Sequence, residues 1–345
     1  MSVIRHLAAG LLAAAFLASP AAVAQPAPAA DVLKVTLCGT SGPLPVRDRA
    51  KSCTAIQAGG SLYLVDIGPE ATENLQTWRL PTASAKAVFI THLHSDHIGD
   101  LGEFNMQSWV QGRPAALAVV GPPGVEKLVA GFNEAYEIDH GFRRAHHEHD
   151  GVTFPIAAGL LAAKVLKMPA AKDAATPITT QAWSENGLTV TAIVVAHDPA
   201  TPAYAYRFDY KGRSVVVSGD TRKWPPLAVA SKDADVMIHE AQNADMTRQM
   251  VAGLKMQNNP RLSSVMNDTL SYHTTPVEAA EIAKAAGVKA LVLDHITQAG
   301  LPFYTPESFT KGVDAVGGPG WRLAKDGMTI DLPVGSAEIS FGQLP

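Results

Sequence analysis

The segment Thr91-His-Leu-His-Ser-Asp-His97 decides the fold of this chain. It places three histidines and one aspartate directly after Val88–Ile90, an apolar segment that we interpret as a buried strand. Imidazole nitrogens and carboxylate oxygens are the ligands that Zn²⁺ and similar divalent metals prefer. The segment therefore predicts a metal site at the carboxyl end of a strand.

Three other apolar segments also end in histidine or aspartate. His197 and Asp198 follow residues 188–195, Gly219 and Asp220 follow residues 214–217, and Asp294 and His295 follow residues 291–293. Sites in α/β sheets gather at the carboxyl ends of strands, so we expect these side chains to meet there. Helical patterns alternate with the strands, which indicates an α/β fold. The clearest helix spans 276–286, between a Thr275–Glu278 capping box and Gly287.

The spacing His92-x-His-x-Asp-His97, followed by Gly99, resembles the signature of metallo-β-lactamase-fold hydrolases. Other segments resemble the ribonuclease Z and arylsulfatase branch of that superfamily, in the same order along the chain: residues 37–53, 197–207, 218–221, 239–241, 273–280 and 291–296. The resemblance implies a four-layer αββα sandwich. Residues 132–183, which are charged and histidine-rich and then Ala/Pro-rich, are the least regular stretch of the chain, and we expect them to form a lid-like insertion.

The resemblance also implies two metal sites. His92, His94 and His197 would hold the first metal. Asp96, His97 and His295 would hold the second, and Asp220 would bridge the two. Two Zn²⁺ ions per chain are expected, although Mn²⁺ or Fe occupies similar sites. Metals that share a water lower its pKa and provide a hydroxide nucleophile.

Three residues are the expected catalytic groups. Asp96 would take the proton of the attacking water. His273, before the helix at 276–286, would contact the anionic substrate and protonate the leaving oxygen, with Glu240 orienting it. A structural ion pair remains an alternative for Glu240, and a helix-start role for His273. We expect Asp66 to hydrogen-bond a ligand loop.

The expected function is hydrolysis of a small anionic ester, an aryl sulfate or a phosphodiester, by an exported dinuclear zinc enzyme. Ring opening of a β-lactam or lactone is the alternative. A tRNA 3′-processing endonuclease is less favoured, because the formal net charge is −4 and no basic arm is visible. We accordingly expect no nucleic-acid partner. Stable membrane insertion is not expected either, and a homodimer is compatible with the sequence.

The N-terminal segment predicts export. Residues 1–24 combine Arg5, an apolar stretch and a small-residue cleavage pattern ending at Ala24, which is typical of a cleaved signal peptide. Residues 25–30 form a Pro/Ala tether, and residues 31–345 form the hydrolase domain. The expected location is therefore periplasmic or secreted.

Two remaining features keep two interpretations each. Cys38 and Cys53, the two cysteines of the chain, fit a disulfide and two buried thiols equally well. The histidine-rich stretch 140–149 fits a solvated face better than a third metal patch.

Overall fold

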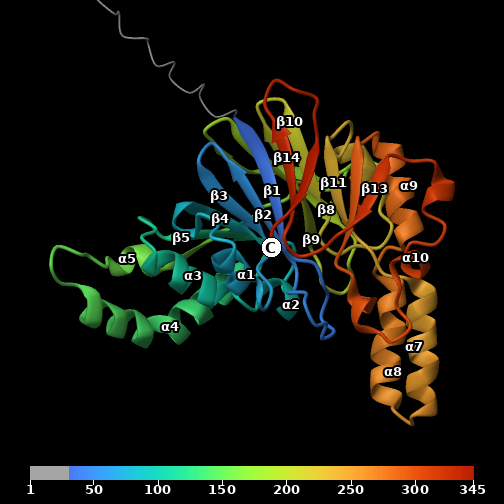
Figure 1. The fold of residues 1–345 in the computed structure, drawn as a ribbon, viewed down its shortest axis with the longest axis horizontal. Helices are drawn as coiled ribbons and strands as arrows, with labels where there is room; N and C mark the ends of the chain where they lie inside the picture. Colours follow the sequence, from blue (N-terminus) through green and yellow to red (C-terminus); the bar gives the residue numbers. More distant parts are fainter. Residues whose placement is uncertain (1–30) are drawn as a thin grey trace, which may run out of the picture. The chain divides into compact units, whose positions relative to one another are not determined.

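Two sheets carry the fold of the protein (Figure 1). The computed structural model describes residues 31–345, which form one unit, Asp31–Pro345. The signal peptide expected at 1–24 and the tether expected at 25–30 lie outside the described residues. Within residues 31–345, no helix combines the length and the apolar character that a membrane span requires.

The first sheet has the order β15-β14-β1-β2-β3-β4-β5-β6. Strands β3 to β6 run parallel to one another, whereas β15, β14, β1, β2 and β3 pair antiparallel. The strand bounds are β1 (Val32–Gly39), β2 (Cys53–Ala58), β3 (Ser61–Val65), β4 (Ala85–Phe89), β5 (Leu117–Gly121), β6 (Leu161–Val165), β14 (Met328–Pro333) and β15 (Ser340–Gln343).

The second sheet has the order β13-β12-β11-β10-β9-β8-β7. Strands β10 to β13 are parallel, and β7 to β10 are antiparallel. The bounds are β7 (Thr179–Glu185), β8 (Leu188–Val195), β9 (Ala203–Tyr210), β10 (Arg213–Val217), β11 (Val236–Glu240), β12 (Ala290–Asp294) and β13 (Gly320–Leu323).

The ten α-helices of the described residues lie outside the two sheets (Figure 1). Helix α9 has the expected bounds and capping box, in which the Thr275 side chain accepts from Glu278 N–H. The bounds are α1 (Ala71–Thr77), α2 (Ser95–Ile98), α3 (Leu101–Val110), α4 (Val125–His147), α5 (Ile156–Gly159), α6 (Pro225–Ala230), α7 (Ala244–Met256), α8 (Pro260–Asp268), α9 (Pro276–Ala286) and α10 (Pro306–Phe309).

Apolar side chains pack on both faces of the first sheet. Phe89 of β4 meets Phe208 of β9 edge to face, with ring centroids 5.5 Å apart, inside the core between the sheets. On the opposite face, Val88 packs in a second core that includes Leu75 of α1 and Phe104 of α3. Helices α6 and α9 pack against the second sheet. These layers confirm the predicted αββα sandwich.

The segment 132–183, expected as a lid-like insertion, builds the sheet edges. It supplies most of α4, then α5, then β6 at one end of the first sheet, and most of β7 at one end of the second. Extended backbone at a sheet edge gains ladder hydrogen bonds, which explains this use of the segment. The cavity beside the predicted metal ligands is lined by other parts of the described chain.

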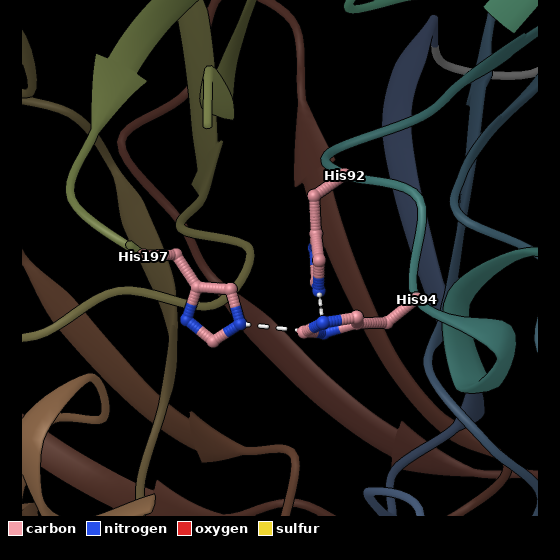
Figure 2. A group of neighbouring side chains, drawn as sticks. All are labelled: His92, His94 and His197. Atoms are coloured by element: carbon pink, nitrogen blue, oxygen red, sulfur yellow. Dashed lines mark hydrogen bonds between the residues drawn. The ribbon is translucent and has the colours of Figure 1, made fainter. Parts of the chain in front are cut away.

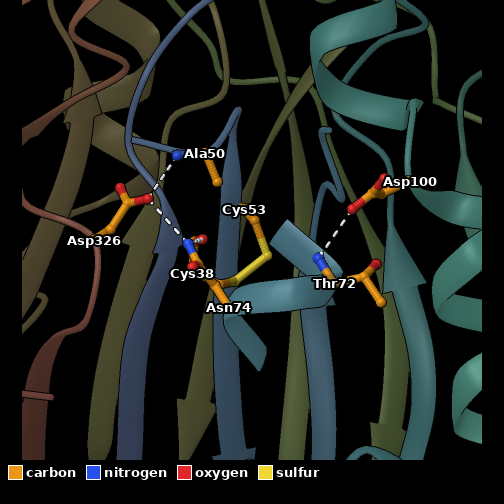
Figure 3. Close-up of a disulfide and its surroundings, with 7 residues drawn as sticks. All are labelled: Cys38, Ala50, Cys53, Thr72, Asn74, Asp100 and Asp326. Atoms are coloured by element: carbon orange, nitrogen blue, oxygen red, sulfur yellow. Dashed lines mark hydrogen bonds between the residues drawn. A yellow bond between two sulfur atoms is a disulfide. The ribbon is translucent and has the colours of Figure 1, made fainter. Parts of the chain in front are cut away.

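A disulfide joins Cys38 of β1 to Cys53 of β2, which settles the alternative left open by the sequence (Figure 3). Hydrogen bonds fasten the loop between these cysteines: Asn74 donates to the Cys38 carbonyl and to Asp326, and Asp326 accepts from the Ala50 backbone. The disulfide and these bonds fix both ends of a loop whose tip, at Pro43, reaches the predicted site.

Candidate metal centre

All seven predicted metal ligands lie at carboxyl ends of strands. The loop after β4 carries His92 and His94, and α2 directly continues it. The remaining five ligands lie on α2 or follow β8, β10 and β12 of the second sheet. These ligands are Asp96 and His97 on α2, His197 after β8, Asp220 after β10, and His295 after β12.

The first predicted group forms a compact triad. His92, His94 and His197 point ring nitrogens toward one another, with His197 facing the β4 loop (Figure 2). His94 Nδ1 lies 2.8 Å from His92 Nε2 and 3.4 Å from His197 Nε2. His94 is exposed whereas the other two are buried, so the triad opens to solvent at His94.

The second predicted group is buried next to the first. Asp96 Oδ2 lies 3.6 Å from His97 Nε2 and 3.3 Å from His295 Nε2. Asp220 lies between the groups: its Oδ2 is 3.4 Å from His97 Nε2 and 3.8 Å from His197 Nε2, and its Oδ1 is 3.5 Å from His295 Nε2. Asp220 therefore has the position of a bridging ligand.

Two buried atoms test whether these residues suit metal ions. His97 Nε2 and Asp220 Oδ1 have no hydrogen-bond partner among the described residues, although such buried polar atoms are normally satisfied. Both point into the cluster, where a cation would satisfy them. Five imidazoles and two carboxylates form a donor set that suits zinc and other borderline divalent metals. The residues therefore fit a divalent metal centre.

The charges of the cluster stabilise its carboxylates. Burial alone would raise the pKa of Asp96, but His97 and His295 lower it to about 2. Burial alone would lower the pKa of His295, but Asp220 and Asp96 raise it to about 9. Burial and the neighbouring His97 lower the pKa of His92 well below its ordinary value, which favours the neutral, metal-binding imidazole.

Asp66 holds the second group from behind, as the sequence predicted. Its Oδ2 is 2.7 Å from His97 Nδ1, which leaves His97 Nε2 directed at the cluster. Thr91 was given no role from the sequence, yet its backbone N–H and its hydroxyl each donate to Asp66 at 2.8 Å. The hydroxyl also lies 3.0 Å from His92 Nδ1. The position of Thr91 directly before the first histidine was the one sequence feature that could have indicated this role.

His273 and Glu240 form the expected pair. His273 Nδ1 lies 2.9 Å from Glu240 Oε1, and Glu240 also accepts from the backbone N–H of Thr221 and Thr274. These contacts fix the carboxylate and leave His273 Nε2 to face the cluster. A ligand atom of His273 groups with those of His197 and Asp220. The pair therefore adjoins the metal centre, where a proton donor would be needed.

A cavity of about 320 Å³ opens over the centre. Metal-site and catalytic residues line one end of it, including His94, Asp220 and His273. Gly42 belongs to the loop beside it: a Cβ there would lie 2.7 Å from His295 Cε1, so only glycine permits this close approach. Helix α8 and Tyr272 supply the opposite wall, which was not predicted from the sequence.

The histidine-rich stretch forms no metal group within residues 31–345. His146, His147 and His149 are exposed, in agreement with a solvated face, while His140 is buried against Trp109 with ring centroids 5.0 Å apart. Trp109 belongs to a small core cluster and not to the cavity. The buried β11 residue His239 also stays outside the centre.

Comparisons with known proteins agree with this geometry. A family model described as "Beta-lactamase superfamily domain" matches residues 62–296. A protein named Ribonuclease Z from Mycolicibacterium paratuberculosis is 32% identical over 271 residues, which cover 78% of this chain and 87% of that protein. One of the same name from Mycolicibacterium gilvum is 30% identical over 267 residues, covering 76% of this chain and 84% of that protein.

Solved structures share the fold. The metallo-β-lactamase-fold protein YhfI from Bacillus subtilis has a TM-score of 0.62 at 21% identity, over 88% of this chain and all of that one. The short form of human tRNase Z has a TM-score of 0.61 at 20% identity, over 87% of this chain and all of that one.

These relatives correct the functional expectation. The prediction of a small aryl sulfate as substrate, with no nucleic-acid partner, is wrong, because the similar proteins are named for ribonuclease activity. The description arylsulfatase-like conflicts with these names as well. A negative net charge does not exclude a nucleic-acid substrate, because bound divalent cations would supply positive charge for a phosphate that a count of lysine and arginine omits.

The predicted superfamily is confirmed, as is a hydrolase fold compatible with a divalent metal. By the family model and by these relatives, the chain belongs to the metallo-β-lactamase superfamily, in its ribonuclease Z branch.

Proposed function

We propose that this protein is a metal-dependent ribonuclease that hydrolyses a phosphodiester bond in tRNA precursors, at the 3′ end. The observation that carries the proposal is the 32% identity to a protein named Ribonuclease Z over 87% of that protein. The geometry of the centre supports it, because Asp220 contacts members of both ligand groups. Two-metal centres of this kind suit in-line displacement at phosphorus.

The chain's own residues have distinct parts in this reaction. Bound divalent metals would lower the pKa of a water and polarise the phosphoryl oxygens. Asp96 lies at the cluster and is positioned to accept a proton from the attacking water. His273 donates a proton to the leaving oxygen as its bond to phosphorus breaks. Glu240 holds the His273 ring by Nδ1, so that Nε2 is the atom that transfers the proton.

The test uses purified protein loaded with Zn²⁺ and a precursor tRNA that carries a 3′ extension. We expect cleavage near the 3′ end of the tRNA, and no cleavage by the Asp220→Ala protein prepared in parallel. An aryl sulfate and a cephalosporin serve as comparison substrates. The proposal is overturned if the metal-loaded protein leaves the RNA intact, whether or not it turns over a comparison substrate.

Export stays a prediction that is separate from this chemistry. The Cys38–Cys53 disulfide is of a kind that persists in oxidising compartments, which supports export of residues 31–345. Cell fractionation with an antibody to the protein tests it. Recovery of the full-length chain with free thiols in the cytoplasmic fraction would contradict export.

A further inference from the structure

Helices α7 and α8 lie side by side and form a hairpin at one end of the second sheet (Figure 1). Each helix begins at an asparagine cap: Asn243 accepts from the Met246 backbone, and Asn259 accepts from the Leu262 backbone. The hairpin occupies the chain between Glu240 and His273. The two partners of the catalytic pair therefore border an element that the metal ligands do not require.

Helix α8 carries an apolar stripe toward the cavity. Leu262, Val265 and Met266 have the spacing i, i+3 and i+4, and all three line the cavity over the metal centre, as does Thr269 directly after the helix. A stripe of this kind normally packs into a core. Here Leu262 is 37% exposed and Val265 is 49% exposed, although both lie beside the site.

The hairpin is fixed to the site by polar contacts. Gln242 follows β11 by two residues and donates to the hydroxyls of Thr247 on α7 and Thr269 at the end of α8. Thr269 in turn donates to the Met266 carbonyl. The amide hydrogens of Gln242 and the hydroxyl hydrogen of Thr269 are donated to other protein atoms. The wall therefore presents an apolar surface to the cavity and not these hydrogen-bond donors.

Tyr272 extends this apolar surface to the metal ligands and His273. Its ring centroid lies 5.0 Å from that of His197 and 5.0 Å from that of His273. The cavity of about 320 Å³ therefore runs from the metal ligands and His273 to the α8 stripe without interruption. Its volume is at the small end of ligand pockets, which span roughly 300–1,000 Å³. One nucleoside fits this space, whereas an RNA stem does not.

We propose that Leu262, Val265 and Tyr272 form the subsite for the nucleobase next to the scissile phosphate, held by stacking and apolar contact. This inference rests on the proposed function. All four bases have a flat apolar face, so the subsite favours substrates that carry a nucleoside but does not distinguish one base from another. The phosphate lies at the metal centre while the base covers the stripe.

The experiment compares two phosphodiesters with the same leaving group. Thymidine 5′-(4-nitrophenyl phosphate) carries a nucleoside, and methyl 4-nitrophenyl phosphate does not. We expect the wild-type protein to favour the nucleoside ester in kcat/KM. The double variant Leu262→Ser with Val265→Ser should lose roughly 10- to 100-fold on the nucleoside ester alone, the range expected when two aliphatic side chains lose their apolar contact with the base.

Matched variants separate a subsite from a structural wall. Met256→Ser removes an apolar side chain of the same hairpin that is 85% exposed and outside the cavity, and it should leave the preference unchanged. Leu262→Met with Val265→Ile keeps both side chains apolar, with one methylene added at the half-exposed position 265, and should retain the preference. Bound metal and thermal unfolding of each variant report whether the fold persists.

Each outcome decides the inference. A preference that falls in the serine variant, with methyl ester turnover unchanged, supports it. Equal losses on both esters, or a preference unchanged in the variant, overturn it. If the wild-type protein cleaves precursor tRNA but does not favour the nucleoside ester, the inference alone fails. If the wild-type protein cleaves neither the RNA nor the esters, the proposed function fails with it.

Discussion

The two ends of the cavity differ in how their residues depend on one another. At the metal end, five histidines and two aspartates are held by mutual charge and by groups behind them, such as Asp66. At the α8 end, half-exposed apolar side chains line a wall that is held in place by neutral hydrogen bonds, such as that from Gln242 to Thr269. We infer that a loss at the metal end removes the whole activity, whereas a loss at the wall changes which substrate is chosen.

Asp220→Ala should have the largest effect. This carboxylate is the one that approaches both ligand groups, so its loss leaves each group short of a ligand. We expect the bound metal to fall from two ions per chain, and kcat to fall by about 10³-fold or more, since metals supply several kcal/mol to the transition state. Elemental analysis and cleavage of precursor tRNA measure both. Wild-type metal content with wild-type kcat would contradict the bridging role.

His273→Ala should separate proton transfer from metal binding. His273 contacts Glu240 and lies beside the ligands without being one of the seven, so both metals should stay bound. Loss of a positioned acid costs about 10²–10⁴-fold. A phosphodiester with a 4-nitrophenolate leaving group needs little protonation, so the variant should lose less on that ester than on RNA. Equal losses on the two substrates would contradict the proposed role.

Asp66→Asn should have a moderate effect on the metal end alone. The carboxylate fixes the His97 ring through Nδ1, and replacing such a partner typically costs about 10–100-fold in metal affinity or activity. Competition with a chelator measures the affinity. The preference for a nucleoside ester over a methyl ester should stay the same, because Asp66 does not line the cavity. A changed preference would show that the two ends are coupled.

Asp235→Asn should leave the activity unchanged and alter acid stability, which makes it a reference outside both ends. Burial would raise the pKa of Asp235, but hydrogen bonds from Lys289, the Ser214 backbone and Arg213 lower it below its ordinary value. A lowered folded-state pKa adds stability that is present above about pH 4 and is lost as the pH falls through the folded pKa.

The free energy of unfolding at neutral pH should therefore be lower in the variant by about 3–5 kcal/mol, because the buried Arg213 loses its carboxylate partner. Its stability should also depend less on pH below about pH 4. Urea unfolding at several pH values measures both effects. If the variant lost stability below about pH 4 as steeply as the wild-type protein, the assigned role of Asp235 would be contradicted.

The metal end could be predicted from the sequence because its ligands are local consequences of strand periodicity. Each ligand follows an apolar run that had to be a strand, and carboxyl ends of such strands meet. His92, His97 and the α9 capping box are therefore readable without a structure. The disulfide was not, because spacing alone does not determine whether two cysteines approach.

The tertiary structure alone decided the substrate end. The spacing of Leu262, Val265 and Met266 is that of an ordinary core-facing stripe, and nothing in the sequence says that it faces a cavity. Where a helical hairpin folds back depends on contacts between residues far apart in the sequence, here those of Gln242 with Thr269 and of Gln298 with Thr247. Local periodicity therefore placed histidines and aspartates at one edge of the sheets, the family resemblance selected the expected metal ligands among them, and long-range packing determined what else the substrate touches.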